Sequence, residues 1–204
     1  EYNVYKKRIY LNVICALLVS VLASGTVASA YNKNNAAKYA QEYALKYNTR
    51  YISYSSDCTN FVSQCLENGG YKQNNTWCCG LASSTKEWSV ADTNYHYILQ
   101  KKWGKLYKRY SKNGKYSAPN SYITVDTGSL VYYDWDGDGK INHASFMSFS
   151  GQNKSTGMYQ SLICQHTTNR KNVTWNLQSY LKDYDKKHNS NRASKCVYYV
   201  VDVG

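Results

Sequence analysis

The sequence predicts a single α+β domain in which N-terminal helices pack on an antiparallel sheet. The first half of the chain contains segments whose apolar residues recur at helical spacing, and the second half contains short β-prone runs bounded by Gly and Asn. Helices that precede strands in this way are typical of an α+β domain. We expect the helix over residues 58–66 to pack against the sheet.

The first thirty residues have the features of an export signal. Lys6–Arg8 form a basic head, a mostly apolar run extends from about Ile9 to Leu22, and Ala28–Ala30 provides the small-x-small pattern of a cleavage site. The alternative is a membrane-spanning helix, but Asn12 and Ser20 interrupt the run, which is shorter than the roughly 20 residues needed to cross a bilayer. We therefore predict a cleaved signal peptide and a secreted, cell-wall-associated protein without a stable membrane span.

The domain left after cleavage, residues 31–204, is long enough to bury an ordinary core. The whole chain has 25 Lys and Arg against 13 Asp and Glu, and the charge of +12 falls to about +10 without residues 1–30. A basic exported protein is expected to attract polyanions, here anionic cell-wall polymers and phospholipid head groups, with a general contribution to solubility as the alternative. The basic residues scattered through 101–115 and 182–195 form no recognisable nucleic-acid-binding module, so we expect no nucleic-acid partner.

Two helices are predicted before the strands, and a third is possible around Ser84–Trp103. Apolar residues recur at helical spacing from Asn35 to Tyr47, with Asn34 or Asn35 as the N-cap. In the next helix, the apolar positions follow i, i+3, i+4, i+7 and i+8, which is one face of a helix. We expect the aspartate that precedes this helix to accept hydrogen bonds from the amides of its first turn. An Asn-Gly-Gly sequence ends the helix. These positions are Cys58, Phe61, Val62, Cys65 and Leu66, preceded by Asp57 and followed by Asn68, Gly69 and Gly70.

The second half predicts four strands. Each is a β-prone run flanked by Gly, Asp or Asn turns. The predicted ranges are Gly128–Tyr133, His143–Phe149, Met158–Gln165 and Lys195–Val203.

Cysteine content allows both disulfides and a free thiol. Six of the seven cysteines follow the predicted signal peptide, and an exported domain can oxidise, so Cys65, Cys78, Cys79, Cys164 and Cys196 are candidates for pairing. The adjacent pair Cys78–Cys79 has no partner pair at zinc-site spacing, so we expect no zinc site.

Cys58 is the strongest candidate for chemistry. A cysteine at a helix N-terminus lies near unpaired backbone amides that favour the thiolate. Taken alone, such a cysteine is more often a small buried hydrophobe. His143 begins one predicted strand and His166 follows another, and adjacent antiparallel strands would bring them together as a base and its orienting partner. His96 and His188 have polar surroundings and are not site candidates.

The run Asp57-Cys58-Thr59-Asn60-Phe61-Val62-Ser63-Gln64-Cys65-Leu66 resembles the hallmark of the bacterial putative amidase domain family, which is similar to NlpC-type wall endopeptidases of the papain-like superfamily. The segments that extend the resemblance are Tyr39–Asn48, Gly128–Trp135, Asn142–Ala144 and Gln165–Thr168. It implies a papain-like fold with Cys58 as nucleophile and His143 as general base.

The resemblance also implies that His166 fixes the His143 tautomer, although Asn142 or Asn169 are alternatives. Asn142 stands where the family often has Asp, which removes a charge beside the imidazole. An oxyanion hole requires the Cys58 backbone amide and a second donor, for which Tyr54 is a candidate.

The segment Asp134–Ile141 matches the first eight positions of an EF-hand loop, with Asp134, Asp136 and Asp138 as candidate calcium ligands. Ser145 occupies the position of the bidentate Glu, so we favour an acidic hairpin turn that delivers His143 and expect no cofactor, with weak calcium binding as the alternative.

The leading hypothesis is a secreted cysteine amidase or peptidase that acts on peptidoglycan stem peptides. Acyl transfer to an acceptor other than water would use the same residues. A non-catalytic wall-binding module with a calcium-stabilised turn is the alternative from a different functional class.

Overall fold

The computed structural model describes residues 30–111 and 121–204. The predicted signal peptide lies outside this part of the chain except for its last residue, so its cleavage stays a prediction. In the described residues, no helix has both the length and the hydropathy required of a membrane span. The helices are α2 (Lys33–Tyr43), α3 (Cys58–Asn68), α4 (Lys86–Ser89), α5 (Ala91–Gln100), α6 (Gln178–His188) and α7 (Arg192–Lys195). The strands are β1 (Gly104–Ser111), β2 (Leu130–Asp134), β3 (His143–Gln152), β4 (Tyr159–Gln165), β5 (Arg170–Thr174) and β6 (Val197–Val203).

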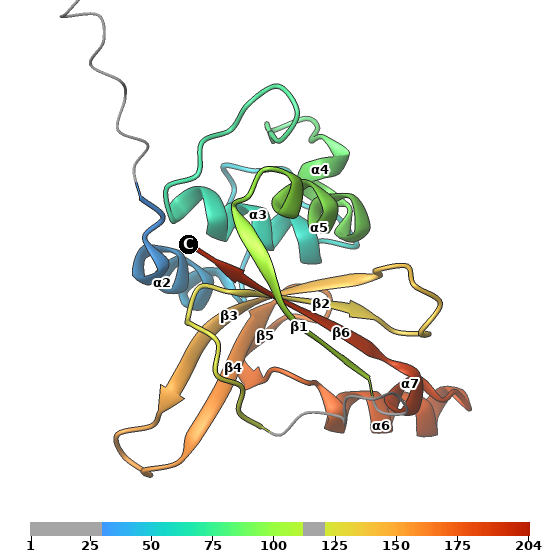
Figure 1. Cartoon of the computed structure of the whole chain (residues 1–204). Coiled ribbons are helices and arrows are strands. Elements are labelled where there is room, and N and C mark those ends of the chain that lie inside the picture. The colour runs from blue at the N-terminus through green and yellow to red at the C-terminus, as the bar shows by residue number, and fades with distance from the viewer. Residues whose placement is uncertain (1–29, 112–120) are drawn as a thin grey trace, which may run out of the picture. The chain divides into compact units, whose positions relative to one another are not determined.

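The described strands form one antiparallel sheet in the order β1-β6-β2-β3-β4-β5, with α2 to α5 on one face and α6 and α7 near the other (Figure 1). Alternate residues of the central strand β2 enter different apolar clusters, so this strand is buried on both faces. Leu130 and Tyr132 pack with α2, α3 and α5, whereas Val131 and Tyr133 pack with Trp175 and Leu181. The α+β prediction is confirmed.

Helix α2 begins earlier and ends earlier than the sequence predicts. Its N-cap is Asn32, not Asn34 or Asn35, and the Asn32 side chain accepts a hydrogen bond from the Asn35 amide at 3.0 Å. The helix ends at Tyr43 because the Tyr43 carbonyl accepts hydrogen bonds from the Lys46 amide (3.2 Å) and His166 Nε2 (2.9 Å), so it is not available to a further helical turn.

Helix α3 packs against α2, α4 and β3, and residues 58–66 are all buried. Its polar side chains hold the neighbouring segments: Asn60 accepts a hydrogen bond from Trp88 Nε1 (2.7 Å), Ser63 donates one to the Trp88 carbonyl (2.7 Å), and Gln64 accepts one from the Tyr39 hydroxyl (2.7 Å). Satisfying these groups offsets the cost of burying them. The polar residues of this motif therefore bind the helical layer together.

Several boundaries and elements differ from the sequence prediction. The single helix expected at 84–103 is two helices, α4 and α5, because Val90 between them has an extended backbone. Strands β1 and β5 and helices α6 and α7 were not predicted. The predicted strand at 195–203 begins only at Val197, because residues 192–195 form the short helix α7.

Candidate active site

Cys58 is the first residue of α3 and is 7% exposed. Its thiol is within hydrogen-bonding reach of His143, of the Ala144 amide and, at 3.7 Å, of the Thr59 hydroxyl. The fold thus brings the predicted nucleophile and the predicted base together, although His143 lies 85 positions after Cys58 in the chain.

The environment of Cys58 favours the thiolate. Burial opposes ionisation, but the charge of His143 and its hydrogen bond, followed by the bonds from the Ala144 amide and Thr59, outweigh burial and lower the pKa of Cys58 to about 7. The unpaired amides at the start of α3 add a favourable field. At neutral pH a large fraction of this buried thiol is therefore ionised.

The imidazole of His143 is held by groups that the sequence analysis did not identify. It is 4% exposed and stacks on Trp135, with ring centroids 5.2 Å apart and planes 28° apart. Its Nε2 atom lies 3.5 Å from Ser145 Oγ, and that hydroxyl donates a hydrogen bond to Gln165 Oε1 at 2.9 Å. Ser145 follows His143 by two positions on β3, so strand alternation places both side chains on one face. This spacing could have indicated Ser145 as a neighbour of the base.

Contrary to the sequence prediction, the ring nitrogens of His166 bond to groups other than His143. Its Nδ1 atom lies 2.6 Å from Asp57 Oδ2, its Nε2 atom lies 2.9 Å from the Tyr43 carbonyl oxygen, and its ring stacks on Phe61 at 4.3 Å. Both ring nitrogens are therefore engaged away from the imidazole of His143. The expectation that His166 orients the base is corrected by this geometry, and Ser145 occupies the place expected for the orienting group.

The carboxylate of Asp57 does not cap the first turn of α3, contrary to the sequence prediction. Besides His166, it accepts hydrogen bonds from the Tyr54 amide (2.9 Å) and Asn60 Nδ2 (2.7 Å). The physical reason is that a buried charge is more stable against a histidine and two donors than against backbone amides alone.

The other polar candidates serve the surrounding turns. Asn142 accepts a hydrogen bond from the Trp135 amide at 2.9 Å, so it closes the hairpin that leads into β3 and does not orient His143. The hydroxyl of Tyr54 bonds to Ser84 Oγ at 2.8 Å. Because this hydroxyl is already engaged, the structure does not support Tyr54 as the second oxyanion donor.

The acidic segment 134–141 forms a hairpin turn between β2 and β3. Asp134 is fully buried and accepts hydrogen bonds from the amides of Gly137 (2.8 Å), Asp138 (3.2 Å) and Gly139 (2.8 Å). Asp136 forms an ion pair with Arg192 at 3.4 Å. These contacts close the turn with groups of the chain itself, in agreement with a turn that delivers His143 to the site.

The six cysteines in the described residues are free thiols. Apart from Cys58, those with altered acidity are shifted in the opposite direction: burial raises the pKa of Cys65, Cys79, Cys164 and Cys196, the last to about 12. Cys58 differs from these four thiols in that its pKa is lowered.

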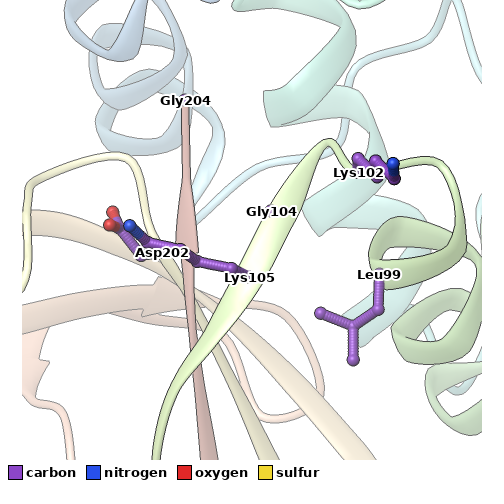
Figure 2. A pocket seen from close by; sticks show the side chains of 6 residues that line it. All are labelled: Leu99, Lys102, Gly104, Lys105, Asp202 and Gly204. Carbon is purple, nitrogen blue, oxygen red and sulfur yellow. The ribbon is translucent and has the colours of Figure 1, made fainter.

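A separate pocket lies where β1 begins and β6 ends (Figure 2). It has a volume of about 460 Å³, and its lining includes Leu99, Lys102, Lys105 and Asp202. None of the residues that line this pocket belongs to the Cys58 site.

Comparison with known proteins places the chain in a family. Residues 30–189 match the family described as "Putative amidase domain". The chain is 30% identical over 175 residues to the uncharacterized protein YjcM of Bacillus subtilis, covering 82% of this chain and 38% of the relative. It is also 30% identical over 126 residues to the uncharacterized protein YhbB of the same organism, covering 59% of this chain and 38% of the relative. No solved structure matches significantly.

Proposed function

The chain belongs to the putative amidase domain family, and on this premise we propose that it is a secreted cysteine amidase or peptidase with Cys58 as nucleophile and His143 as its acid–base partner. The amidase family indicates amide hydrolysis in general terms. The observation that carries the cysteine mechanism is the contact between His143 and a thiol whose pKa is lowered to about 7 at the start of α3.

The reaction proceeds in two steps. The Cys58 thiolate attacks the amide carbonyl carbon, forming a C–S bond, and the C–N bond breaks as the His143 imidazolium gives its proton to the leaving amine. Water then attacks the thioester while His143 accepts its proton. The C–S bond breaks, the acid product leaves, and the thiolate–imidazolium pair forms again.

The first turn of α3 supports the charge that develops on the carbonyl oxygen. Cys58 is the first residue of this turn, which has no side-chain cap, and its backbone amide is the oxyanion donor that we propose. The stack of Trp135 on His143 adds a favourable interaction with the imidazolium that forms during the cycle.

Peptidoglycan stem peptides are the substrate class that we propose. The predicted signal peptide would place the domain outside the cell, and a domain charge of about +10 suits a wall that is rich in polyanions. The papain-like relationship and the wall location belong to this proposal. The chain spans about 38% of the length of each curated relative, so the full activity of a longer protein is part of the proposal as well.

Digestion of purified peptidoglycan under reducing conditions tests this function. Wild type and Cys58→Ser are compared by mass spectrometry of the soluble products, with and without calcium. New amine termini formed by wild type alone are expected. Equal products from both proteins would exclude the cysteine mechanism, and the absence of cleavage by wild type would reject the wall substrate.

The same digestion separates the alternatives. An added amine nucleophile that appears in the product would show acyl transfer in place of hydrolysis. Binding to the wall without cleavage, dependent on calcium, would support the non-catalytic module.

A further inference from the structure

The buried pair of Asp57 and His166 has no part in the proposed reaction steps, yet it lies directly beside the nucleophile. The side chains of Asp57 and His166 are 0% and 1% exposed, and the carboxylate belongs to the residue before Cys58. Ionisable groups buried this deeply are costly unless they are paired.

The hydrogen bonds fix where the protons of His166 lie. Nε2 faces the Tyr43 carbonyl oxygen at 2.9 Å, and a carbonyl oxygen only accepts, so Nε2 carries a hydrogen. Nδ1 and Asp57 Oδ2 are 2.6 Å apart, a separation that requires a proton between them. The pair as a whole therefore holds this shared proton and has no net charge.

Asp57 links three segments around the start of α3. Its Oδ1 atom accepts hydrogen bonds from the Tyr54 amide (2.9 Å) and from Asn60 Nδ2 (2.7 Å). Its own amide donates to Thr167 Oγ1 (2.8 Å), in the turn that follows β4. Turning Asp57 away from α3 leaves the first-turn amides without a side-chain cap.

We propose that His166 is a positioning residue that neutralises and orients Asp57, and through Asp57 holds the first turn of α3 uncapped and free of net negative charge beside Cys58. This inference rests on the proposed role of Cys58 as nucleophile. Without the proton of His166, a buried carboxylate one residue away would disfavour the thiolate, and it would be free to turn back onto the helix amides.

Aromatic rings and a second thiol lie around the pair. The Tyr47 and Phe61 rings pack on His166, with centroid distances of 4.6 and 4.3 Å. Besides Cys58, a titratable neighbour is Cys79, whose sulfur lies 3.8 Å from Asn60 Oδ1 and whose pKa is raised, first by burial.

Two asparagine substitutions separate charge from shape. In His166→Asn the amide nitrogen takes the place of Nδ1 and donates to Asp57 without carrying a positive charge. In the double variant Asp57→Asn/His166→Asn both groups are neutral and still bond to each other. In His166→Gln the longer amide reaches the position of Nε2 and loses the bond to Asp57, so the charge and the bond are removed together and the midpoint should rise at least as far as in His166→Asn.

The measurement is the rate of Cys58 alkylation by iodoacetamide against pH, mapped by peptide mass spectrometry on the whole protein. We expect His166→Asn to move the midpoint upward by about one pH unit, and the double variant to restore the wild-type midpoint. A merely structural role would not be rescued by a second substitution. An unchanged midpoint in folded His166→Asn, or the lack of rescue, would overturn the proposal.

Asp57→Asn alone keeps the proposal testable if His166→Asn does not fold. The amide that this substitution introduces can donate to Nδ1 of a neutral His166, so the pair again has no net charge and the midpoint should stay at the wild-type value. A drop of about one pH unit would show that the native pair carries an uncompensated negative charge. Because alkylation needs no substrate, this result is independent of whether wild type cleaves peptidoglycan.

Discussion

Replacing His143 with Leu should shift the ionisation of Cys58 and reveal how much of its acidity depends on this contact. The substitution removes the charge and the hydrogen bond that lower the pKa of Cys58, while burial, which raises it, remains. The pKa of the thiol should therefore return from about 7 to at least its ordinary value of 9.0. Two pH units correspond to about 2.7 kcal/mol of lost thiolate stabilisation.

The magnitude follows from the thiolate fraction and the nucleophilicity. At pH 7 the ionised fraction falls from about one half to about 1%, a loss of roughly 50-fold. A more basic thiolate is intrinsically about 8-fold more reactive over two pH units, so the net alkylation rate at pH 7 should fall about 6-fold. Near pH 10, where both thiols are ionised, the variant should react about 7-fold faster than wild type.

The assay is iodoacetamide labelling from pH 5 to pH 10 with mass mapping of the Cys58 peptide. His96→Leu is the matched control, because His96 is exposed and lies outside the site. We expect the plot of alkylation rate against pH to cross that of wild type between pH 7 and pH 10 for His143→Leu, and not for His96→Leu. If the midpoint for Cys58 stays near 7 in His143→Leu, the inferred thiolate–imidazolium pair is wrong.

Three further substitutions test the surroundings of the site. Ser145→Ala should lower kcat by about 10-fold with little change in KM, because the hydroxyl orients His143 and does not bind substrate; an equal rise in KM would contradict this role. Trp135→Ala should weaken imidazolium stabilisation by about 0.5–1 kcal/mol and reduce Cys58 alkylation at pH 6 by about 2- to 5-fold, whereas Trp135→Phe should retain most of the rate. Asp134→Ala leaves three turn amides without their acceptor and should lower the free energy of unfolding by about 2–4 kcal/mol in urea titrations. A loss below about 1 kcal/mol would show that the turn does not depend on this carboxylate. A rise in the stability of wild type on addition of calcium would instead favour the ion-binding alternative.

Local sequence patterns were sufficient for the elements that carry the reactive residues. The apolar positions from Cys58 to Leu66 predicted α3 because a buried helix face repeats at 3.6 residues. The β-prone run that begins at His143 predicted β3, and the Gly- and Asp-rich segment before it predicted the turn. These patterns, with the resemblance of residues 57–66 to the amidase motif, gave the nucleophile and the base that we propose.

Elements with polar sequences escaped prediction. Strand β5 contains mostly exposed polar residues, so it has no alternating apolar pattern and forms only by pairing with β4 at the sheet edge. Helix α6 buries only Leu181, which is too little apolar periodicity to identify a helix from sequence. Such elements are set by tertiary pairing more than by local preference.

The roles of Asp57 and His166 required the tertiary structure. An aspartate before a helix is ordinarily read as an N-cap, and only the packing of the turn after β4 against α3 shows that a buried histidine takes its carboxylate. His166 was identified as a site residue from its position at a strand end, but its partner lies 109 positions away in the chain. Sequence reasoning therefore gave the proposed pair of Cys58 and His143 but not the side chains that contact them.

Trapping the covalent intermediate tests the central claim most directly. Wild type and Cys58→Ala are mixed with soluble peptidoglycan fragments, quenched in acid during turnover, digested and analysed by mass spectrometry. We predict that the peptide containing Cys58 gains the mass of the acyl half of the substrate, and that Cys58→Ala neither gains this mass nor releases an amine. Continued amine release by Cys58→Ala, or an acyl group on a different cysteine, would contradict the account.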